Sequence, residues 1–275
     1  MISETAYAKI NLALHVRGRR DDGYHTVETL FAFAEDGDAL TVAPSDRLSL
    51  TIEGPFAVGL SSGPDNLILR AAEALRQVGG ITEGAHFTLD KRLPVASGIG
   101  GGSADAAATL RLAARLWGVD GGAADLALLA AKLGADVPAC VGSTACLGTG
   151  LGDHLQPVDR ADIAGLSVLL VNPLLPCPTG PVFAGWDGLD RGPLEVAGWR
   201  TARNDLDAPA RALVPEIGDV LAALGAQTGV RLARMSGSGA TCFALFDGEP
   251  ARDATEQAIA RAHPGWWTLA SRLRG

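Results

Sequence analysis

The chain has 275 residues, of which 47% are hydrophobic and 20% charged, and its formal net charge is −8. This composition predicts a globular protein with one large domain or two medium ones, and it excludes a disordered chain. The acidic balance argues against a general nucleic-acid-binding surface, and an anionic substrate would have to be met by local basic groups.

The cysteines show no C-x-x-C spacing and no histidine at the spacing of a metal site. We expect all four to be reduced and to pack as small apolar side chains. The sequence has neither a run of 18 uncharged apolar residues nor a signal-peptide pattern. A soluble, cytoplasmic protein without membrane partners is therefore expected.

Residues 5–16 alternate between apolar and polar side chains, which predicts a strand with one face in the core. Lys9 and Asn11 project side by side from the other face, about 7 Å apart by the rise of a strand. On local evidence, a lysine in this position is more typical of a solvated strand face than of a functional site.

A polar loop between Arg17 and Thr26 contains the adjacent rings of Tyr24 and His25. The two rings could stack on a flat ligand and hydrogen-bond to it. Equally, Tyr24 could cover the core while His25 caps a strand, and the local sequence leaves both interpretations open.

Strands are then predicted at 27–33, 38–42, 47–53 and 86–90. Between the last two, Asp65 and Asn66 are expected to cap a helix that runs to about Val78 and ends at Gly79 and Gly80.

The stretch from Pro94 to Ala108 has four glycines in five positions, and it leads into a helix predicted over 103–117 with Ser103 as N-cap. Such a loop presents unpaired N–H groups and the positive end of a helix dipole, which suits a phosphate. A P-loop would need a lysine after Gly102, and a dinucleotide-binding turn would need an acidic residue ending a later strand. By itself, the loop is also compatible with a structural glycine turn.

A further helix is predicted from about 124 to 133, ending at Gly134. Asp136 follows in apolar surroundings and precedes Pro138. Because a carboxylate just past a helix C-terminus is electrostatically unfavourable, this position favours a functional group over a turn former.

The second half is predicted to begin with a strand at 166–171, followed by a proline-rich loop that carries Phe183. Asn204 opens a helical region that reaches about Arg211. The remaining elements are predicted as a helix at 215–224, strands at 231–235 and 241–246, a helix at 250–262 and a strand at 266–269. The order β, helical region, α, β, β, α, β is close to the split βαβ, ferredoxin-like order.

Three motifs occur in the order typical of the GHMP small-molecule kinases, which the chain resembles: Ala8 to Leu12, Pro94 to Ala107, and Met235 to Ala240. The resemblance implies an α+β, two-domain fold. An ATP-binding N-terminal domain, similar to domain 2 of ribosomal protein S5, is expected over 1–157, and a ferredoxin-like C-terminal domain over 158–275.

Five further segments narrow the resemblance to one branch of that family: Gly23 to His25, Asp65 to Leu67, Asp90 to Pro94, Gly134 to Pro138, and Asn204 to Leu206. Members of that branch use ATP and Mg²⁺ to phosphorylate the 2-hydroxyl of a cytidine diphosphate-linked methylerythritol, in the non-mevalonate route to isoprenoid precursors.

Two alternatives compete with that branch. A sibling GHMP kinase acting on mevalonate, homoserine or a sugar would leave Tyr24 and His25 without a purpose. A nucleotide- or RNA-binding module would need a basic surface and no acid at Asp136, so no nucleic-acid partner is expected.

The resemblance implies Asp136 as the general base and Lys9 as the group that keeps it ionised and stabilises charge on the transferred phosphate. Asn11 would help to orient the substrate hydroxyls. The cytosine would stack between Tyr24 and Phe183.

His25 would read the polar edge of that ring. The residues that the resemblance implies for ATP are Asn66, Lys91, Pro94, Val95, Ala96, Ser97, Gly98, Ile99, Gly100, Gly101, Gly102, Ser103 and Ala104. Ala104 replaces a residue that is often serine, which removes a hydroxyl near the phosphates. Gly180 replaces a residue that is often proline, which makes the segment around Phe183 more flexible. The metal ligands stay open, as does the choice between a monomer and a homodimer.

Overall fold

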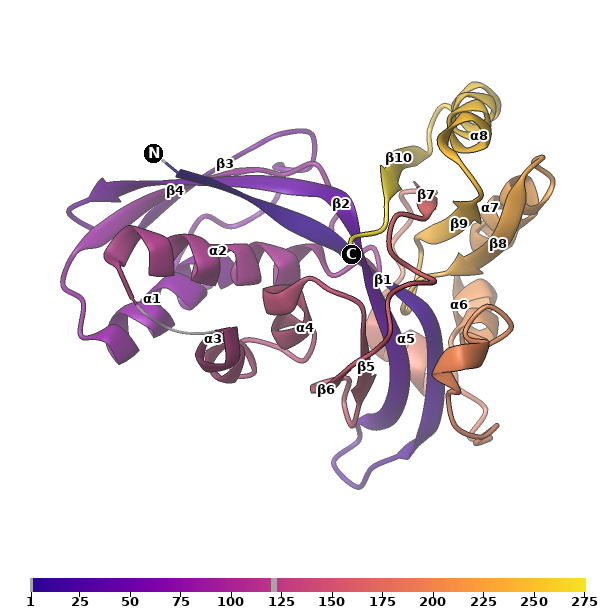
Figure 1. Ribbon diagram of the computed structural model, residues 1–275, viewed down its shortest axis with the longest axis horizontal. Helices are drawn as coiled ribbons and strands as arrows, with labels where there is room; N and C mark the ends of the chain where they lie inside the picture. The colour runs from indigo at the N-terminus through magenta and orange to yellow at the C-terminus, as the bar shows by residue number, and fades with distance from the viewer. Residues whose placement is uncertain (1, 120–122) are drawn as a thin grey trace. The chain divides into compact units, whose positions relative to one another are not determined.

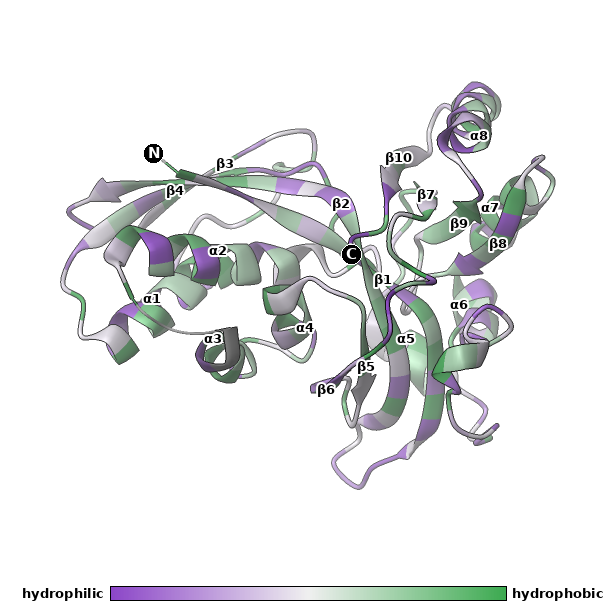
Figure 2. Cartoon of the chain, in the orientation of Figure 1, coloured by the Kyte–Doolittle hydropathy of each residue, from purple (hydrophilic) through white to green (hydrophobic). Residues whose placement is uncertain are grey.

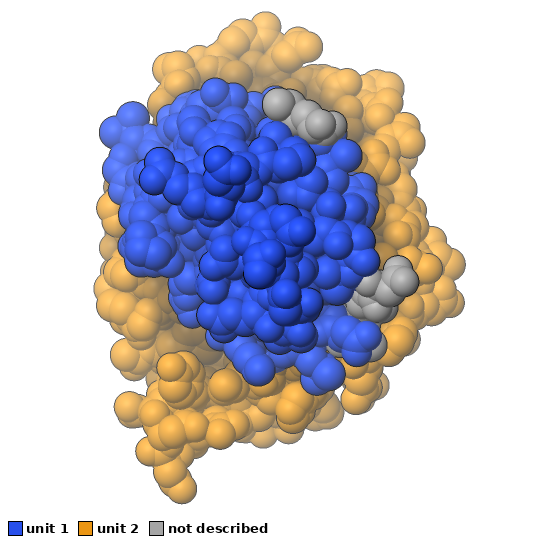
Figure 3. All heavy atoms as spheres, turned by 90° about the vertical axis from the view of Figure 1, so that its left-hand side faces the viewer, with its two compact units in different colours: residues 1–8, 36–95, 100–143 blue, residues 9–35, 96–99, 144–275 orange. Residues whose placement is uncertain are grey.

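The computed structural model describes residues 2–119 and 123–275. It divides into two compact units, which Figure 3 shows in different colours. Unit 1 consists of residues 1–8, 36–95 and 100–143, and unit 2 of residues 9–35, 96–99 and 144–275. The chain enters each unit more than once, and the domain boundary between 157 and 158 stays a prediction.

The sheet of unit 1 contains β3 (Ser49–Glu53), β4 (Gly84–Asp90) and the second half of β2 (His25–Ser45). β4 lies between the other two, antiparallel to β2 and parallel to β3. The helices lie on one face of this sheet (Figure 1): α1 (Leu67–Gly79), α2 (Gly101–Trp117), α3 (Ala123–Ala130) and α4 (Val137–Gly142).

Helix α1 has the predicted caps. The Asn66 side chain accepts a hydrogen bond from the backbone N–H of Ile68 at 2.9 Å, and Gly80 ends the helix at a φ of 61°. Its buried residues recur at helical spacing, as expected for a helix that covers a sheet.

Helix α2 begins earlier than predicted. Gly100, at a φ of 62°, is the N-cap without a side-chain hydrogen bond, and Gly101 opens the helix. The prediction of Ser103 as N-cap is therefore wrong, and Ser103 lies inside the first turn. The helix is buried along most of its length, which explains its many small alanines.

β2 is one continuous strand where the sequence predicted two. The polar run at Glu35 and Asp36, followed by Gly37, is typical of a turn. In the structure, a Cβ on Gly37 would stand 1.9 Å from the carbonyl oxygen of Ala6. Gly37 therefore permits a close approach of β1 (Ile2–Arg19) to β2 and does not break the strand.

The second sheet belongs to unit 2 and has the order β10-β7-β9-β8, with every neighbouring pair antiparallel. The strands are β7 (Ser167–Asn172), β8 (Val230–Met235), β9 (Cys242–Phe246) and β10 (Trp267–Arg272). The central strands β7 and β9 are buried throughout and mostly green in Figure 2. With α7 (Glu216–Gly225) and α8 (Glu249–Ala262), the order confirms the ferredoxin-like prediction.

Between β7 and α7 the chain forms α5 (Thr179–Ala184), a short 3₁₀ helix (Val196–Gly198) and α6 (Asp207–Leu213). Phe183 therefore lies in a helix and not in a loop. Unit 2 also contains an unpredicted hairpin of β5 (Cys146–Thr149) and β6 (His154–Pro157). β6 is short, polar and largely exposed, so it gave no alternating signal.

The four cysteines are free and buried, as expected. Within residues 2–119 and 123–275, no helix is both long enough and apolar enough to cross a membrane.

Candidate active site

Lys9 and Asn11 lie together in β1, within unit 2. Lys9 Nζ donates a hydrogen bond of 2.9 Å to Asn11 Oδ1, and both residues are only 3% exposed. The interpretation of Lys9 as a lysine on a solvated face is therefore wrong. Both faces of β1 are buried here, so the charge is held in place among protein groups.

Neighbouring side chains on β2 fix this pair. Asn11 Nδ2 donates to Thr29 Oγ1 at 2.7 Å, and Thr29 Oγ1 donates to the carbonyl of Ala13 at 2.8 Å. Lys9 Nζ also lies 5.2 Å from the centre of the Phe31 ring. Because the amide nitrogen of Asn11 is bonded to Thr29, the amide oxygen is the atom that faces the lysine. Thr29 and Phe31 were not predicted as site residues; they lie two residues apart on β2, as Lys9 and Asn11 do on β1.

The serine of the third motif links this strand to the glycine loop. Ser236 Oγ accepts a hydrogen bond from the backbone N–H of Asn11 at 3.1 Å and donates to the carbonyl of Gly98 at 2.9 Å. The N–H of Lys9 donates to the carbonyl of Ile99 at 3.0 Å. Parts of all three sequence motifs thus meet within unit 2.

Gly98 has to be glycine. Its φ is 78°, and a Cβ there would stand 2.6 Å from the carbonyl oxygen of Ser236 and 2.7 Å from that of Gly239. Ala96 has a φ of 52°, which is uncommon for a residue with a side chain. This tightly held segment of the loop offers its carbonyls to the protein, namely those of Ser97, Gly98 and Ile99.

The loop continues in unit 1 as the start of α2. The first N–H groups of an α-helix have no partner inside the helix, and Gly100 provides no side-chain cap. The N–H groups of Gly101, Gly102 and Ser103 are in this position. This is the geometry that binds a phosphate at a helix N-terminus.

Lys91 lies beneath the first turns of α2, in a buried ionic cluster of unit 1. Its Nζ is 2.6 Å from Oδ2 of Asp38 and 2.6 Å from Oδ2 of Asp105. Asp38 Oδ1 also accepts the N–H groups of Arg92 and Leu93. Burial lowers the pKa of Lys91, but the two carboxylates outweigh that effect, so the lysine stays charged.

Asp105 is fully enclosed in this cluster. Burial raises its pKa to about 7, and the negative charge of Asp38 adds to the effect while Lys91 opposes it. Its buried Oδ1 has no hydrogen-bond partner among the residues described. With a proton on Asp105, the positive charge of the Lys91 ammonium is matched by one carboxylate and not by two.

Asn66 and Asp136 both act as helix N-caps in unit 1. The amide of Asn66 is committed to Ile68 N and to the carbonyl of Ser61. Asp136 is half-buried and precedes α4, whose first hydrogen bond runs from Cys140 N to the Asp136 carbonyl at 3.2 Å. Its carboxylate is thus at a favourable helix start, not at the end of α3, and the sequence argument from an unfavourable dipole is wrong.

The predicted ring-binding residues are partly brought together within unit 2. The rings of His25 and Phe183 are 5.2 Å apart, and Trp186 meets His25 edge-on at 5.7 Å. Tyr24 is 65% exposed on the neighbouring turn. Burial lowers the pKa of His25, with a smaller effect from Arg19, so the neutral ring is favoured.

Trp186 was missed by the sequence analysis. It lies three residues after Phe183, beyond the end of α5 at Ala184, and the short spacing of the two aromatic residues is the signal that could have identified it. The three rings form one aromatic cluster, which we call the His25 cluster (His25, Phe183 and Trp186).

No group of three or more His, Cys, Asp or Glu side chains that could hold a metal occurs in the part of the chain that the structure describes. The sequence predicted no metal ligands, and the structure adds none among these residues.

Family comparisons agree with the architecture. The GHMP kinases N terminal domain matches residues 66–144, and the GHMP kinases C terminal domain matches residues 196–264. A 4-diphosphocytidyl-2-C-methyl-D-erythritol kinase of Rhizorhabdus wittichii is 54% identical, covering 99% of this chain and 94% of the relative. One of Erythrobacter litoralis is 50% identical over 100% of both chains.

Among solved structures, a 4-(cytidine 5'-diphospho)-2C-methyl-D-erythritol kinase matches with a TM-score of 0.85 and 33% identity over 100% of both chains. The Methanococcus jannaschii mevalonate kinase matches with a TM-score of 0.73 but only 10% identity, over 100% of this chain and 98% of that one. The second likeness concerns the fold alone.

Proposed function

Because the chain belongs to the GHMP kinase family, among the 4-diphosphocytidyl-2-C-methyl-D-erythritol kinases, we propose that it phosphorylates that cytidyl alcohol at its 2-hydroxyl with ATP. The products are the 2-phosphate and ADP. The observation that carries the proposal is the buried Lys9, joined through Asn11 and Ser236 to the glycine loop.

In the proposed reaction, the Asp136 carboxylate takes the proton of the 2-hydroxyl. The oxygen forms a bond to the γ-phosphorus, and the bond between that phosphorus and the β,γ-bridging oxygen breaks to release ADP. Lys9 supplies positive charge for the transferred phosphoryl group, and Asn11 keeps the ammonium oriented. A hydroxyl is a weak nucleophile, so positioning and charge stabilisation are the main sources of acceleration.

We propose that the triphosphate binds at the N-terminus of α2. The support is the uncapped helix start after Gly100 and the neighbouring glycines, which leave the backbone open to a phosphate. Lys91 and Asn66 support this site indirectly in the proposal. Lys91 holds α2 in place through its ion pair with Asp105, and Asn66 caps α1.

Mg²⁺ fits this arrangement as a companion of ATP. It is usually held by one or two protein oxygens together with phosphates, and so it needs no dedicated cluster of protein ligands. The Ser103 hydroxyl, in the first turn of α2, is one side-chain oxygen close to the proposed phosphate position. When bound, the ion neutralises charge on the phosphate oxygens.

The His25 cluster supports a cytosine as part of the substrate. Aromatic faces stack on a nucleobase, and a neutral imidazole can both donate and accept hydrogen bonds at its edge. Tyr24, exposed on the adjacent turn, is the proposed second stacking ring. Mevalonate and homoserine carry no aromatic ring for these side chains to bind.

The test is ADP formation with the cytidyl alcohol, mevalonate and homoserine as separate acceptors. We expect turnover with the cytidyl alcohol and background rates with the other two. Turnover only with mevalonate or homoserine would overturn the proposed substrate and leave a sibling kinase.

A further inference from the structure

Helix α4 carries Asp136 at its N-terminus but has only six residues. A helix this short is not stable in isolation and depends on contacts from outside. Its residues from Val137 to Val141 are buried, yet burial alone does not fix the rotation of a helix about its axis. The carbonyl groups at its C-terminal end need partners, since the last turn of a helix leaves them unpaired.

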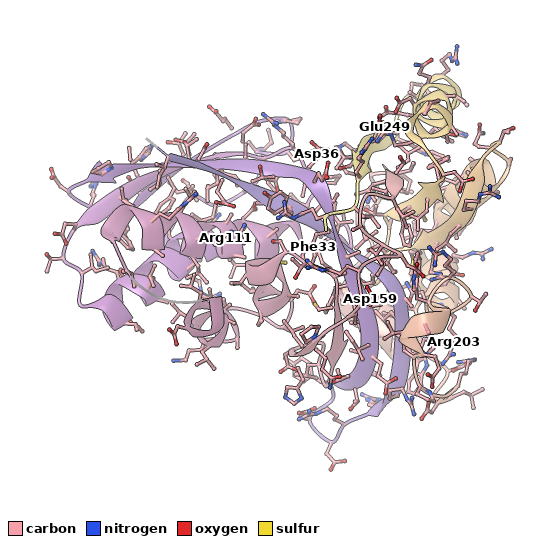
Figure 4. All side chains as sticks on the ribbon, in the orientation of Figure 1. Phe33, Asp36, Arg111, Asp159, Arg203 and Glu249 are labelled. Carbon is pink, nitrogen blue, oxygen red and sulfur yellow. The ribbon has the colours of Figure 1, made fainter. Side chains whose placement is uncertain are left out.

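Arg111, on α2 and labelled in Figure 4, supplies those partners within unit 1. Its Nη1 donates to the carbonyls of Cys140 at 2.8 Å and Val141 at 3.1 Å. Its Nη2 donates to the carbonyl of Thr5 on β1 at 3.2 Å, and its Nε pairs with Glu4 at 3.2 Å. One guanidinium thus joins α2, α4 and β1.

Cys140 connects this guanidinium directly to Asp136. Its carbonyl accepts Arg111, while its own N–H donates to the carbonyl of Asp136 at 3.2 Å. Ser143 Oγ donates to the same Cys140 carbonyl at 2.6 Å and completes the C-terminal cap. From Arg111 to the backbone of Asp136 there is therefore a single intervening residue.

We propose that Arg111 is a positioning residue for the general base, because it holds α4 in the orientation that presents the Asp136 carboxylate. The inference rests on the proposed role of Asp136. Arg111 does not touch the substrate in this proposal; it acts through Cys140 and α4. A planar fork with three nitrogens makes these contacts together, and the single ammonium of a lysine can make only part of them.

Arg115 provides a matched control. It lies one turn further along α2 and also pairs with Glu4, at 2.6 Å, but its side chain is 53% exposed and its hydrogen bonds go to Ser3 and Glu4, at the start of β1. Arg111→Met and Arg115→Met therefore remove similar charges from the same helix and share the loss of a Glu4 partner.

The experiment measures kcat, both KM values and the thermal unfolding midpoint for Arg111→Met, Arg111→Lys and Arg115→Met. Each change is also made together with Asp136→Asn. We expect Arg111→Met to lower kcat roughly tenfold to a hundredfold, since small misplacements of a catalytic group have effects of that order. KM for ATP should change less than about twofold. Arg111→Lys should recover part of the loss, and Arg115→Met should keep kcat within about twofold.

The combined variants separate positioning from general stability. If Arg111 acts through Asp136, Arg111→Met lowers the residual turnover of Asp136→Asn by less than about twofold. An unchanged kcat in folded Arg111→Met, or the same fold-loss with and without the Asp136 carboxylate, would overturn the inference. Should Arg111→Met fail to fold, Arg111→Lys takes its place. Its smaller loss of kcat should likewise disappear in the Asp136→Asn background, and an unchanged kcat or the same fold-loss in both backgrounds would overturn the inference. Full turnover in Asp136→Asn would instead overturn the proposed base.

Discussion

Lys9 Nζ donates a 2.9 Å hydrogen bond to Oδ1 of Asn11, and both side chains are buried on the polar face of β1. The amide nitrogen of Asn11 is in turn bonded to Thr29 Oγ1 at 2.7 Å. Thr29 thereby decides which end of the Asn11 amide faces the ammonium. In the proposed function, a lysine oriented in this way meets the transferred phosphate without reorganisation.

Thr29→Val should lower kcat about tenfold, because the Asn11 amide loses the acceptor that fixes its rotation. Thr29→Ser keeps the hydroxyl and should retain most of the activity. Steady-state kinetics of the two variants provides the measurement. Equal rates for both, in proteins with equal unfolding midpoints, would show that the orientation of Asn11 does not matter.

Asp105→Asn should flatten the dependence of stability on pH. The pKa of Asp105 is raised to about 7 in the folded protein, so above its ordinary pKa the native state holds a proton that the unfolded chain has lost. The native state binds more protons in that window, and the free energy of unfolding therefore falls as pH rises from about 4 to about 7.

Urea unfolding at pH 5 and pH 8 measures this effect. On going from pH 5 to pH 8, the stability of Asp105→Asn should rise relative to that of the wild type, because the variant lacks the carboxyl group that loses its proton. Asp46→Asn, which changes an exposed aspartate, is the control and should keep the wild-type difference. An identical pH difference in Asp105→Asn would contradict the assignment of the proton to Asp105.

Gly98→Ala should lower the free energy of unfolding by about 2 kcal/mol or more, because the methyl overlaps two carbonyl oxygens at a φ that disfavours side chains. Gly102→Ala is the control for stability. There, the nearest atom to a new Cβ is Leu67 Cδ1 at 3.6 Å, an ordinary contact, and alanine is the better helix former. Chemical denaturation of both variants should rank Gly102→Ala well above Gly98→Ala, and similar stabilities would refute the steric argument.

Phe183→Ala should raise KM for the cytidyl substrate about tenfold and leave KM for ATP within about twofold, because stacking on a base contributes about 1–3 kcal/mol. The control is Trp266→Leu, which removes the partner of His263 in another stacked pair of unit 2, with ring centres 3.7 Å apart. That change should alter neither KM. Parallel increases in both KM values of Phe183→Ala would count against a role for Phe183 at the cytosine.

Much of the fold follows from local sequence. The caps of α1 at Asn66 and Gly80, and the order of elements after Leu166, were predicted from residue types alone. The α1 caps could be predicted because Asn66 and Gly80 act through neighbouring backbone groups. The continuity of β2 was missed because Gly37 is required by the close approach of the Ala6 backbone. Ala6 is distant in sequence, so no local pattern reveals this contact.

The candidate site shows the same division. Lys9, Asn11 and the glycine loop stand out as motifs, but the burial of Lys9 depends on β2 and on Ser236. An alternating pattern occurs both in strands with one buried face and in strands with two. Periodicity alone therefore favoured the wrong surroundings for Lys9. Likewise, the start of α2 at Gly101 was missed, since glycine has a poor helix propensity and its φ freedom at position 100 decides the boundary.

ATP binding and phosphoryl transfer by Asp136→Asn, measured side by side, test the proposed catalysis most directly. The variant keeps the shape of the side chain but lacks the negative charge and cannot take a proton. Binding of ATP by calorimetry should stay within about twofold of wild type, while kcat with the cytidyl alcohol should fall at least a hundredfold, the usual effect of losing a general base. Asp125→Asn, at an exposed aspartate of α3, should keep both. Wild-type turnover by Asp136→Asn would contradict a phosphoryl transfer that depends on this carboxylate.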